Sequence, residues 1–272
     1  MPYITLSHGP TYYELDGPDT AELIIFIHGF SSPSQVWDPS FEFLKTQGYQ
    51  VLRYDLYGRG RSAKPGKKYT EKFLVAQLSE LIHSLQLTTK PSTVIGMSMG
   101  GVIAAYFIKQ YPTQVNRLVL IDTAGFPWSP QLVPKMLRIP LVNKKIFSVR
   151  AKKALLSKHQ VYLEKLGKIV PYADIYARQF QEKAYLNALL STLLHFPTQS
   201  AEEVFQHIGQ MDIPKLLIWG EEDETIPFFM SDRFTKVLPG VEFHSIPGAG
   251  HMPHFEQPDV VNPIILAFLC SH

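Results

Sequence analysis

The chain has 272 residues, of which 45% are hydrophobic and 18% charged, and this composition is typical of a soluble enzyme that buries a full core. The net charge of only +2 argues against a dedicated nucleic-acid binder, and no apolar run approaches the ~18 residues of a membrane span. One cysteine, Cys270, excludes an internal disulfide and a cysteine-based metal cluster. The first residues lack a basic stretch followed by an apolar one, so we expect a cytoplasmic protein.

In chain order, the sequence first predicts a hairpin over residues 3–15, turning around His8-Gly9-Pro10. Short apolar runs then alternate with helical patterns. Strands buried on both faces of a parallel sheet are continuous apolar runs, which predicts strands at 23–27, 50–54, 93–95, 118–121, 215–219 and 241–246. Helices are predicted at 41–46, 72–85, 101–111, 230–237 and 260–269. The pattern indicates an α/β fold with a mostly parallel central sheet flanked by helices.

This alternation stops after Asp122 and resumes at Pro214. Between them, amphipathic helical stretches are broken by prolines, and no clear parallel strand appears. We therefore predict a helical cap, residues 125–210, inserted into one core domain made of residues 1–124 and 211–272. Such an insertion would sit over the strand ends, where open α/β sheets bind ligands.

The charge of the inserted region is uneven. Residues 126–200 hold 12 Lys/Arg and 3 Asp/Glu, a net charge of +9, so the remainder of the chain nets −7. A solvated helix face is the ordinary interpretation of such a charge run. The alternatives are peripheral contact with an anionic membrane and attraction of an acidic substrate, because the basic residues are interleaved with apolar ones.

One segment, Gly96-Met97-Ser98-Met99-Gly100-Gly101, lies between a predicted strand and a predicted helix. A serine on such a turn can be held out as a nucleophile. The turn strains the serine backbone, so the residues two before and two after it must be nearly free of side chain. Gly96 and Gly100 meet that need. The alternative is a glycine-rich loop that lets a helix pack on a strand.

A serine nucleophile needs a base, and the base needs an orienting carboxylate. Acidic residues follow the predicted strand that ends at Trp219, namely Glu221, Glu222, Asp223 and Glu224, and His251 follows the strand that ends at residue 246. Both segments would lie at the same edge of the sheet as Ser98. Chemistry alone does not choose among the four acids, and His244 and His254 compete with His251 for the role of base.

Four motifs occur in compatible order: His28-Gly29; Asp55, Gly58, Gly60 and Ser62; Gly220, Asp223 and Pro227; and Gly250-His251, Glu256 and Pro258. With these motifs the chain resembles the α/β-hydrolase family over essentially its whole length. The resemblance implies Asp223 as the acid, with Asp122 as a second place where relatives put it, and His251 as the base. It also implies an oxyanion hole from the backbone N–H groups of Phe30 and Met99. His28 and His244 are then structural residues, and His254 is a candidate to line the same pocket.

The segment Gly58-Arg59-Gly60-Arg61-Ser62-Ala63 also fits a dinucleotide-binding fingerprint, but that fingerprint must open a helix. Lys64-Pro65-Gly66 interrupts any helix here, so no cofactor is expected, and the proposed chemistry requires no metal.

The sequence thus predicts a serine hydrolase acting on a small-molecule carboxylic ester with a hydrophobic acyl group, such as a monoacylglycerol or lysolipid. Two alternatives use the same fold. One is a hydrolase of carbon–carbon bonds in aromatic catabolism, with the same three residues. The other is a non-catalytic ligand-binding or signalling protein, because a fold does not fix a function.

Overall fold

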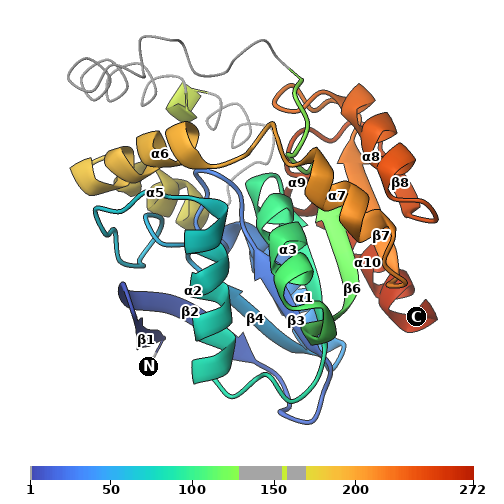
Figure 1. Cartoon of the computed structure of the whole chain (residues 1–272), viewed down its shortest axis with the longest axis horizontal. Helices are drawn as coiled ribbons and strands as arrows, with labels where there is room; N and C mark the ends of the chain where they lie inside the picture. The colour runs from blue at the N-terminus through green and yellow to red at the C-terminus, as the bar shows by residue number, and fades with distance from the viewer. Residues whose placement is uncertain (1, 129–154, 158–169) are drawn as a thin grey trace.

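The computed structural model describes residues 2–128, 155–157 and 170–272, and within them eight strands form one sheet (Figure 1). The strand order is β1-β2-β4-β3-β5-β6-β7-β8. The β1–β2 hairpin joins β4 antiparallel, and every pair from β4 to β8 is parallel. The strands are β1 (Tyr3–Leu6), β2 (Gly9–Asp16), β3 (Leu23–Ile27), β4 (Gln50–Tyr54), β5 (Ser92–Met97), β6 (Val115–Ile121), β7 (Lys215–Gly220) and β8 (Glu242–Ile246).

Helices cover both faces of this sheet, as the alternating pattern predicts. Helices α2, α3, α7 and α8 contribute to the apolar cluster on one face, and α1, α5 and α10 contribute to the cluster on the other; α6 contributes to both. In Figure 1, α2, α3 and α7 lie in front of the sheet. The helices are α1 (Asp38–Thr46), α2 (Glu71–Ser84), α3 (Met99–Gln110), α5 (Val170–Gln179), α6 (Lys183–His195), α7 (Glu202–Gly209), α8 (Ser231–Val237), α9 (Pro253–Glu256) and α10 (Pro258–Ser271).

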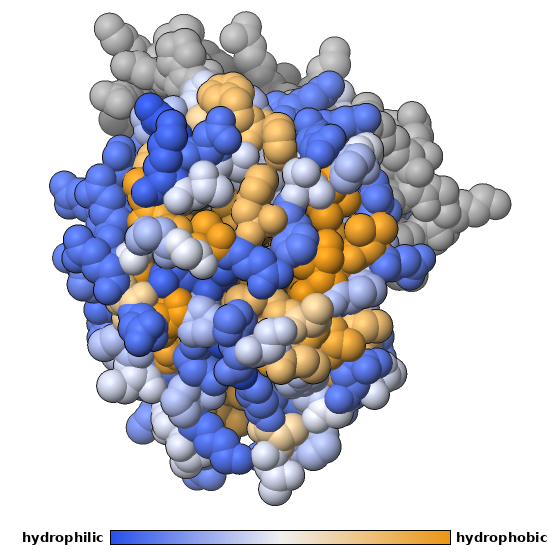
Figure 2. Space-filling view, turned by 90° about the vertical axis from the view of Figure 1, so that its right-hand side faces the viewer, coloured by the Kyte–Doolittle hydropathy of each residue, from blue (hydrophilic) through white to orange (hydrophobic). Residues whose placement is uncertain are grey.

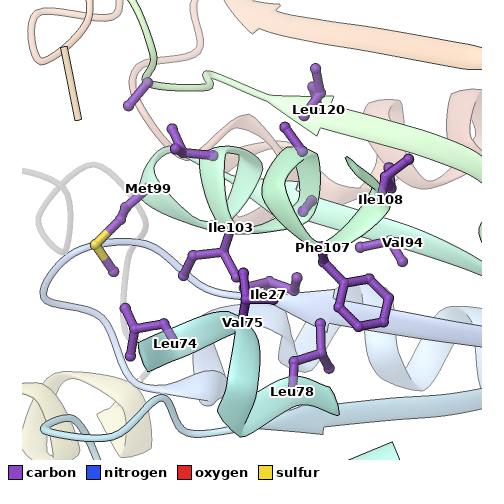
Figure 3. Packing of buried hydrophobic residues seen from close by; sticks show 14 of the residues in the cluster. Ile27, Leu74, Val75, Leu78, Val94, Met99, Ile103, Phe107, Ile108 and Leu120 are labelled. Atoms are coloured by element: carbon purple, nitrogen blue, oxygen red, sulfur yellow. The ribbon is translucent and has the colours of Figure 1, made fainter. Parts of the chain in front are cut away.

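The central strands are buried on both sides. All five residues of β3 are buried, with Ile25 and Ile27 in the first cluster and Ile24 and Phe26 in the second. Figure 3 shows Ile27 beneath α3, on the same side of that helix as Val75 and Leu74 of α2. Burial of a large aliphatic side chain contributes about 1.5–3 kcal/mol. The central strands therefore anchor the sheet, and their carboxyl ends are rigid platforms for loops.

The structure extends several predicted elements. Helix α3 begins at Met99 rather than residue 101, so the glycine pair of the serine turn is already helical. Helix α1 begins at Asp38 rather than residue 41, because Pro39 favours the first turn of a helix. Helix α9 was not predicted, since its four residues are too few to show a helical period.

Helices α5, α6 and α7 follow β6 in the described part of the predicted insertion. Tyr185 of α6 donates to the Ser31 carbonyl at 2.8 Å, so α6 contacts the loop that follows β3. Helix α7 packs against α3 and α8. The limits of the cap stay a prediction. The basic residues 144–145 and 150–153, on which the membrane-contact alternative rests, lie outside the described residues.

Figure 2 shows the side of the molecule on which α8 and β8 lie, where apolar patches are separated by hydrophilic residues. β8 is an edge strand, and its Phe243 stacks on Phe228 with ring centroids 6.4 Å apart. Neighbouring Phe229 is 61% exposed. In the described part of the chain, every helix is too short or too polar to cross a membrane.

Candidate active site

Four polar side chains follow the ends of four adjacent strands. Ser98 directly follows β5, and Asp122 directly follows β6. Asp223 lies three residues beyond β7, and His251 lies five residues beyond β8. Because these strands are parallel neighbours, their carboxyl ends meet at one edge of the sheet, which is where open α/β sheets place ligands.

Ser98 occupies a strained turn between β5 and α3. Its backbone has φ +53° and ψ −119°, a combination that is costly for a residue with a side chain. Its N–H donates to the Ile121 carbonyl at 3.0 Å, and its carbonyl accepts from Gly101 and Ala124 at 3.1 Å each. These bonds hold the strained backbone in place.

The glycines around Ser98 are required by close backbone approach. A Cβ on Gly96 would lie 2.6 Å from the Gly100 carbonyl oxygen. A Cβ on Gly100 would clash with the Ile27 carbonyl oxygen of the neighbouring strand. Both sites therefore exclude any side chain, as the sequence predicts.

Met99 is the first residue of α3, so its N–H is one of the donors that a helix leaves without an internal partner. Its side chain is buried and lies near Leu74 of α2 in Figure 3. The side chain thus anchors the residue in the core while the amide stays at the helix N-terminus. Within the described residues, no protein hydrogen bond uses the amide of either Met99 or Phe30.

His28 fixes the loop that carries Phe30. Its Nε2 accepts the Leu56 N–H at 2.9 Å, and its Nδ1 lies 2.9 Å from the Gly29 carbonyl, to which it donates. Burial lowers the pKa of His28 to about 4, so the ring is neutral at pH 7. These contacts give His28 a structural role: it ties the end of β3 to the end of β4.

Arg59 supports the same loop, and sequence analysis did not single out its role. Its side chain is fully buried, and its Nε donates to the Phe30 carbonyl at 2.9 Å. One terminal nitrogen donates to the Tyr57 carbonyl at 3.2 Å and the other to Thr192 Oγ1 of α6 at 2.7 Å. The guanidinium therefore links the Phe30 loop to a helix of the predicted cap.

The turn that carries Arg59 is built by the Asp55 motif. Asp55 Oδ1 accepts the Ser34 N–H at 2.7 Å and Oδ2 accepts the Arg61 N–H at 2.8 Å. Ser62 Oγ donates to the Asp55 carbonyl at 2.6 Å. No helix opens here, since α2 begins only at residue 71, so the segment lacks the geometry of a dinucleotide fingerprint.

Asp223 and His251 form a buried pair. Asp223 Oδ2 lies 2.7 Å from His251 Nδ1, and the Asp223 side chain has no exposed surface. The other oxygen, Oδ1, accepts the N–H groups of Thr225 at 2.7 Å and Ile226 at 2.9 Å. Both oxygens of Asp223 therefore accept at least one hydrogen bond.

The competing acids and histidines lie elsewhere. Glu221, Glu222 and Glu224 are exposed. His244 lies on β8 with its Nε2 2.7 Å from Glu242. His254 is buried and stacks on Trp37 with ring centroids 4.1 Å apart; it is not among the described residues that line the cavity at Ser98. Burial, together with His251, lowers the pKa of His254 to about 3.

Glu256 positions the loop of His251. Its two carboxylate oxygens accept the backbone N–H groups of Gly250 at 2.8 Å and Met252 at 2.9 Å, on either side of His251. This bridge explains why a glutamate stands five residues after the histidine in the motif. The resulting loop holds His251 with its Nδ1 towards Asp223.

A cavity of about 180 Å³ lies at this edge of the sheet. Ser98 and His251 both line it, which brings the predicted nucleophile and base to one space. Its remaining described lining is mostly apolar surface, although half of the residues carry a hydroxyl group: Phe30, Ser31, Ser32, Met97, Leu155, Tyr176, Thr225 and Met252. Within this described lining, no lysine or arginine is present.

One group of acidic and histidine side chains among the described residues has the spacing of metal ligands. Single ligand-type atoms of Asp122, Asp223 and His251 lie within 4.8 Å of one another. Asp223 and His251 are already joined by a hydrogen bond, and Asp122 Oδ1 accepts the Gly220 N–H at 2.9 Å. We therefore assign the group as a hydrogen-bonded cluster.

Comparison with known proteins agrees with this architecture. Residues 22–258 match the family described as alpha/beta hydrolase fold. The chain belongs to the alpha/beta hydrolase fold family. A structure of this same fold, the enol-lactonase from Burkholderia xenovorans LB400, superposes with a TM-score of 0.82 at 20% identity and covers 99% of this chain and 100% of its own.

Two relatives in sequence differ in the activity that their names state. The "Putative 2-succinyl-6-hydroxy-2,4-cyclohexadiene-1-carboxylate synthase" of Bacillus subtilis is 30% identical over 280 aligned positions, covering 98% of each chain. "Lipase 3" of a Moraxella species is 29% identical over 259 positions, covering 93% of this chain and 79% of its own. This alpha/beta hydrolase therefore has relatives whose names state different activities, so its substrate must be argued from its own site.

Proposed function

We propose that this protein hydrolyses carboxylic esters with hydrophobic acyl groups, with Ser98 as nucleophile, His251 as base and Asp223 as the orienting acid. The observation that carries the proposal is the buried hydrogen bond between Asp223 and His251. His251 lines the same cavity as Ser98, which the strained turn presents there. A nucleophile, a base and a group that orients the base are the parts that acyl transfer requires. The relatives named as lipases support the same reaction class.

The reaction follows from the assigned hydrogen bonds. His251 Nδ1–H donates to the Asp223 carboxylate, which leaves Nε2 as the basic nitrogen. Nε2 takes the proton of Ser98 while Oγ attacks the ester carbonyl carbon. The alcohol leaves with that proton, and an acyl-serine remains. His251 then activates water, which releases the carboxylic acid and regenerates Ser98.

We assign the oxyanion hole to the N–H groups of Phe30 and Met99. The Met99 amide lies at the N-terminus of α3, where the helix dipole favours negative charge. The buried Arg59 holds the Phe30 carbonyl and thereby the orientation of the adjoining peptide. Each such donor is worth about 3 kcal/mol of barrier.

The cavity favours a neutral and fairly short acyl group. Its described lining is mainly apolar, and its volume of about 180 Å³ is below the ~300–1,000 Å³ of pockets for drug-sized ligands. The name of the B. subtilis relative denotes a product with a carboxylate. Recognition of a carboxylate generally uses arginine or lysine, and neither occurs in the described lining. An uncharged ester therefore fits this site better than such a substrate.

Hydrolysis of a p-nitrophenyl ester series, from acetate to palmitate, tests the proposal. We expect turnover with an optimum among the shorter chains, and Ser98→Ala should reduce kcat at least about 1,000-fold. Ser84→Ala, at an exposed serine of α2, is the matched control. A wild type inactive on every ester would refute ester hydrolysis, and an active Ser98→Ala variant would refute the assigned nucleophile.

A further inference from the structure

Asp122 is a buried carboxyl group for which the proposed ester mechanism has no role. It directly follows β6, has no exposed surface, and its N–H donates to the Ile218 carbonyl at 3.0 Å. Its backbone has φ +42°, a conformation that aspartate and asparagine tolerate better than most residues. The surrounding structure thus holds this side chain at one position beside the active-site pair.

The two oxygens of Asp122 have different surroundings. Oδ1 accepts the Gly220 N–H at 2.9 Å, whereas Oδ2 receives no hydrogen bond from any described residue. A buried carboxylate oxygen without a donor is costly. The Asp122 carboxyl is also within 4.8 Å of both the Asp223 carboxyl and the His251 ring. A protonated Oδ2 facing the Asp223 carboxylate would remove the penalty, because it would be a donor.

In the described part of the chain, the charged and titratable groups that face Asp122 come from three elements. Asp223 lies in the loop after β7, His251 in the loop after β8, and Glu256 on α9. Glu256 is already paired with two backbone N–H groups, and Asp223 receives three N–H donors. From the described residues Asp122 receives only one, so of the two adjacent aspartates it is the better placed to hold a proton.

Electrostatics supports the same assignment. Two carboxylates that share a buried site cannot both ionise at ordinary pH. Burial, followed by the neighbouring Asp223 carboxylate, raises the pKa of Asp122 well above its usual range.

We propose that Asp122 is a positioning residue that stays protonated at neutral pH and donates a hydrogen bond from Oδ2 to the Asp223 carboxylate. The chain of contacts then runs from Asp122 through Asp223 to His251. The added bond fixes the rotation of the Asp223 carboxylate, so that its Oδ2 stays directed at His251. The effect of Asp122 on catalysis rests on the proposed function, whereas its protonation does not depend on any substrate.

Infrared difference spectroscopy tests the protonation directly. The spectrum of wild type minus that of Asp122→Asn, both at pH 7, should show the carbonyl stretch of a protonated carboxyl group as a positive band. Asparagine is the matched variant, since its carbonyl can accept from Gly220 and its amide can donate to Asp223. A negative or absent carboxylic-acid band would overturn the inference, whatever the protein does to esters.

Kinetics then separates positioning from a merely structural role. Asp122→Leu removes the donor and should lower kcat about 10- to 100-fold, the value of one hydrogen bond to a charged group. Asp122→Asn should recover most of that loss. The apparent pKa of the acidic limb of kcat/KM should shift by less than about half a unit in Asp122→Asn, because the neutral asparagine replaces a neutral carboxyl group.

The opposite results are equally specific. If Asp122 were ionised, Asp122→Asn would remove a negative charge beside His251 and lower that apparent pKa by about one unit or more. A divalent ion held by the cluster would also keep both carboxyls ionised, and would show as a metal content that Asp122→Asn loses. Either result overturns the inference. Absence of ester turnover together with a positive carboxylic-acid band would instead refute only the proposed function.

Discussion

The two halves of the site are held by different forces. On one side, the Ser98 turn is shaped by steric close approach and by backbone hydrogen bonds, with Gly96 and Gly100 against neighbouring carbonyls. On the other side, Asp223 and His251 are held by charged groups, with Glu256 on the loop behind them.

This difference indicates how each half should respond to change. Steric constraints do not depend on pH, and they fail completely when an atom is added. Charged hydrogen bonds fail in proportion to the charge or donor removed, and they depend on pH. The comparison is therefore tested by two kinds of substitution. One adds an atom at the Ser98 turn, and the other removes a charge from the Asp223–His251 pair.

The largest expected effect is on the steric side. Gly100→Ala places a Cβ against the Ile27 carbonyl, a backbone atom of a buried strand that cannot move aside. We expect loss of the folded protein or destabilisation by more than about 4 kcal/mol, measured by denaturant unfolding. Gly66→Ala is the control, because a Cβ there meets nothing within 4 Å. Equal stability of the two variants would contradict the steric account.

The next effect is on the charged side. Asp223→Asn keeps the size of the side chain but no longer fixes the His251 tautomer, so kcat should fall about 10⁴-fold while the protein stays folded. The exposed neighbour Glu224→Gln serves as the control. If both variants hydrolysed an ester that the wild type cleaves with equal kcat, Asp223 would not be the orienting acid.

A smaller effect is expected from the support of the Phe30 loop. Arg59→Lys loses the fork that reaches the Phe30 carbonyl and Thr192 together, so kcat/KM should drop about 10- to 100-fold. Thr192→Val removes only the link to α6 and should cost less than about fivefold. Steady-state kinetics of both variants checks the order, and an equal loss in both would mean that the contact with α6, rather than with the loop, carries the effect.

The last effect concerns acid stability. Burial lowers the pKa of His254 to about 3, against 6.5 for an ordinary histidine, so the unfolded chain binds this proton first as the pH falls. The free energy of unfolding should therefore decrease from about pH 6.5 downward, by up to about 1.4 kcal/mol per pH unit for this residue. His254→Phe, which keeps an aromatic ring on Trp37, should weaken that slope, with exposed His83→Phe as control. If the free energy of unfolding fell equally steeply with pH in wild type and in His254→Phe, His254 would not be the source of the slope.

Much of the fold could be predicted from the residues alone. Central strands such as β3 and β7 are continuous apolar runs, because both faces of a parallel sheet are buried. The Ser98 turn was predictable for a steric reason, since Gly96 and Gly100 are the residues that the close approach demands. The motif singled out Asp223 among four neighbouring acids, and the structure places its carboxylate against His251.

Other parts of the site depend on contacts that no local pattern records. The approach of Asp122 to Asp223 requires β6 and β7 to be neighbours across the whole inserted region. Arginine in a loop is usually exposed, but folding buries the Arg59 side chain against the Phe30 carbonyl. His254 was expected as a candidate for the cavity lining, yet packing against Trp37 places it in the core. These features arise from tertiary packing, which periodicity and propensity do not encode.

The central claim is that Ser98 is an activated nucleophile, and covalent labelling tests it most directly. A fluorophosphonate should react to one equivalent per chain, peptide mapping should place the adduct on Ser98, and Ser98→Ala should not react. Absence of labelling in the folded wild type, or an adduct on another serine, would contradict the account and favour a non-catalytic binding role for this member of the family.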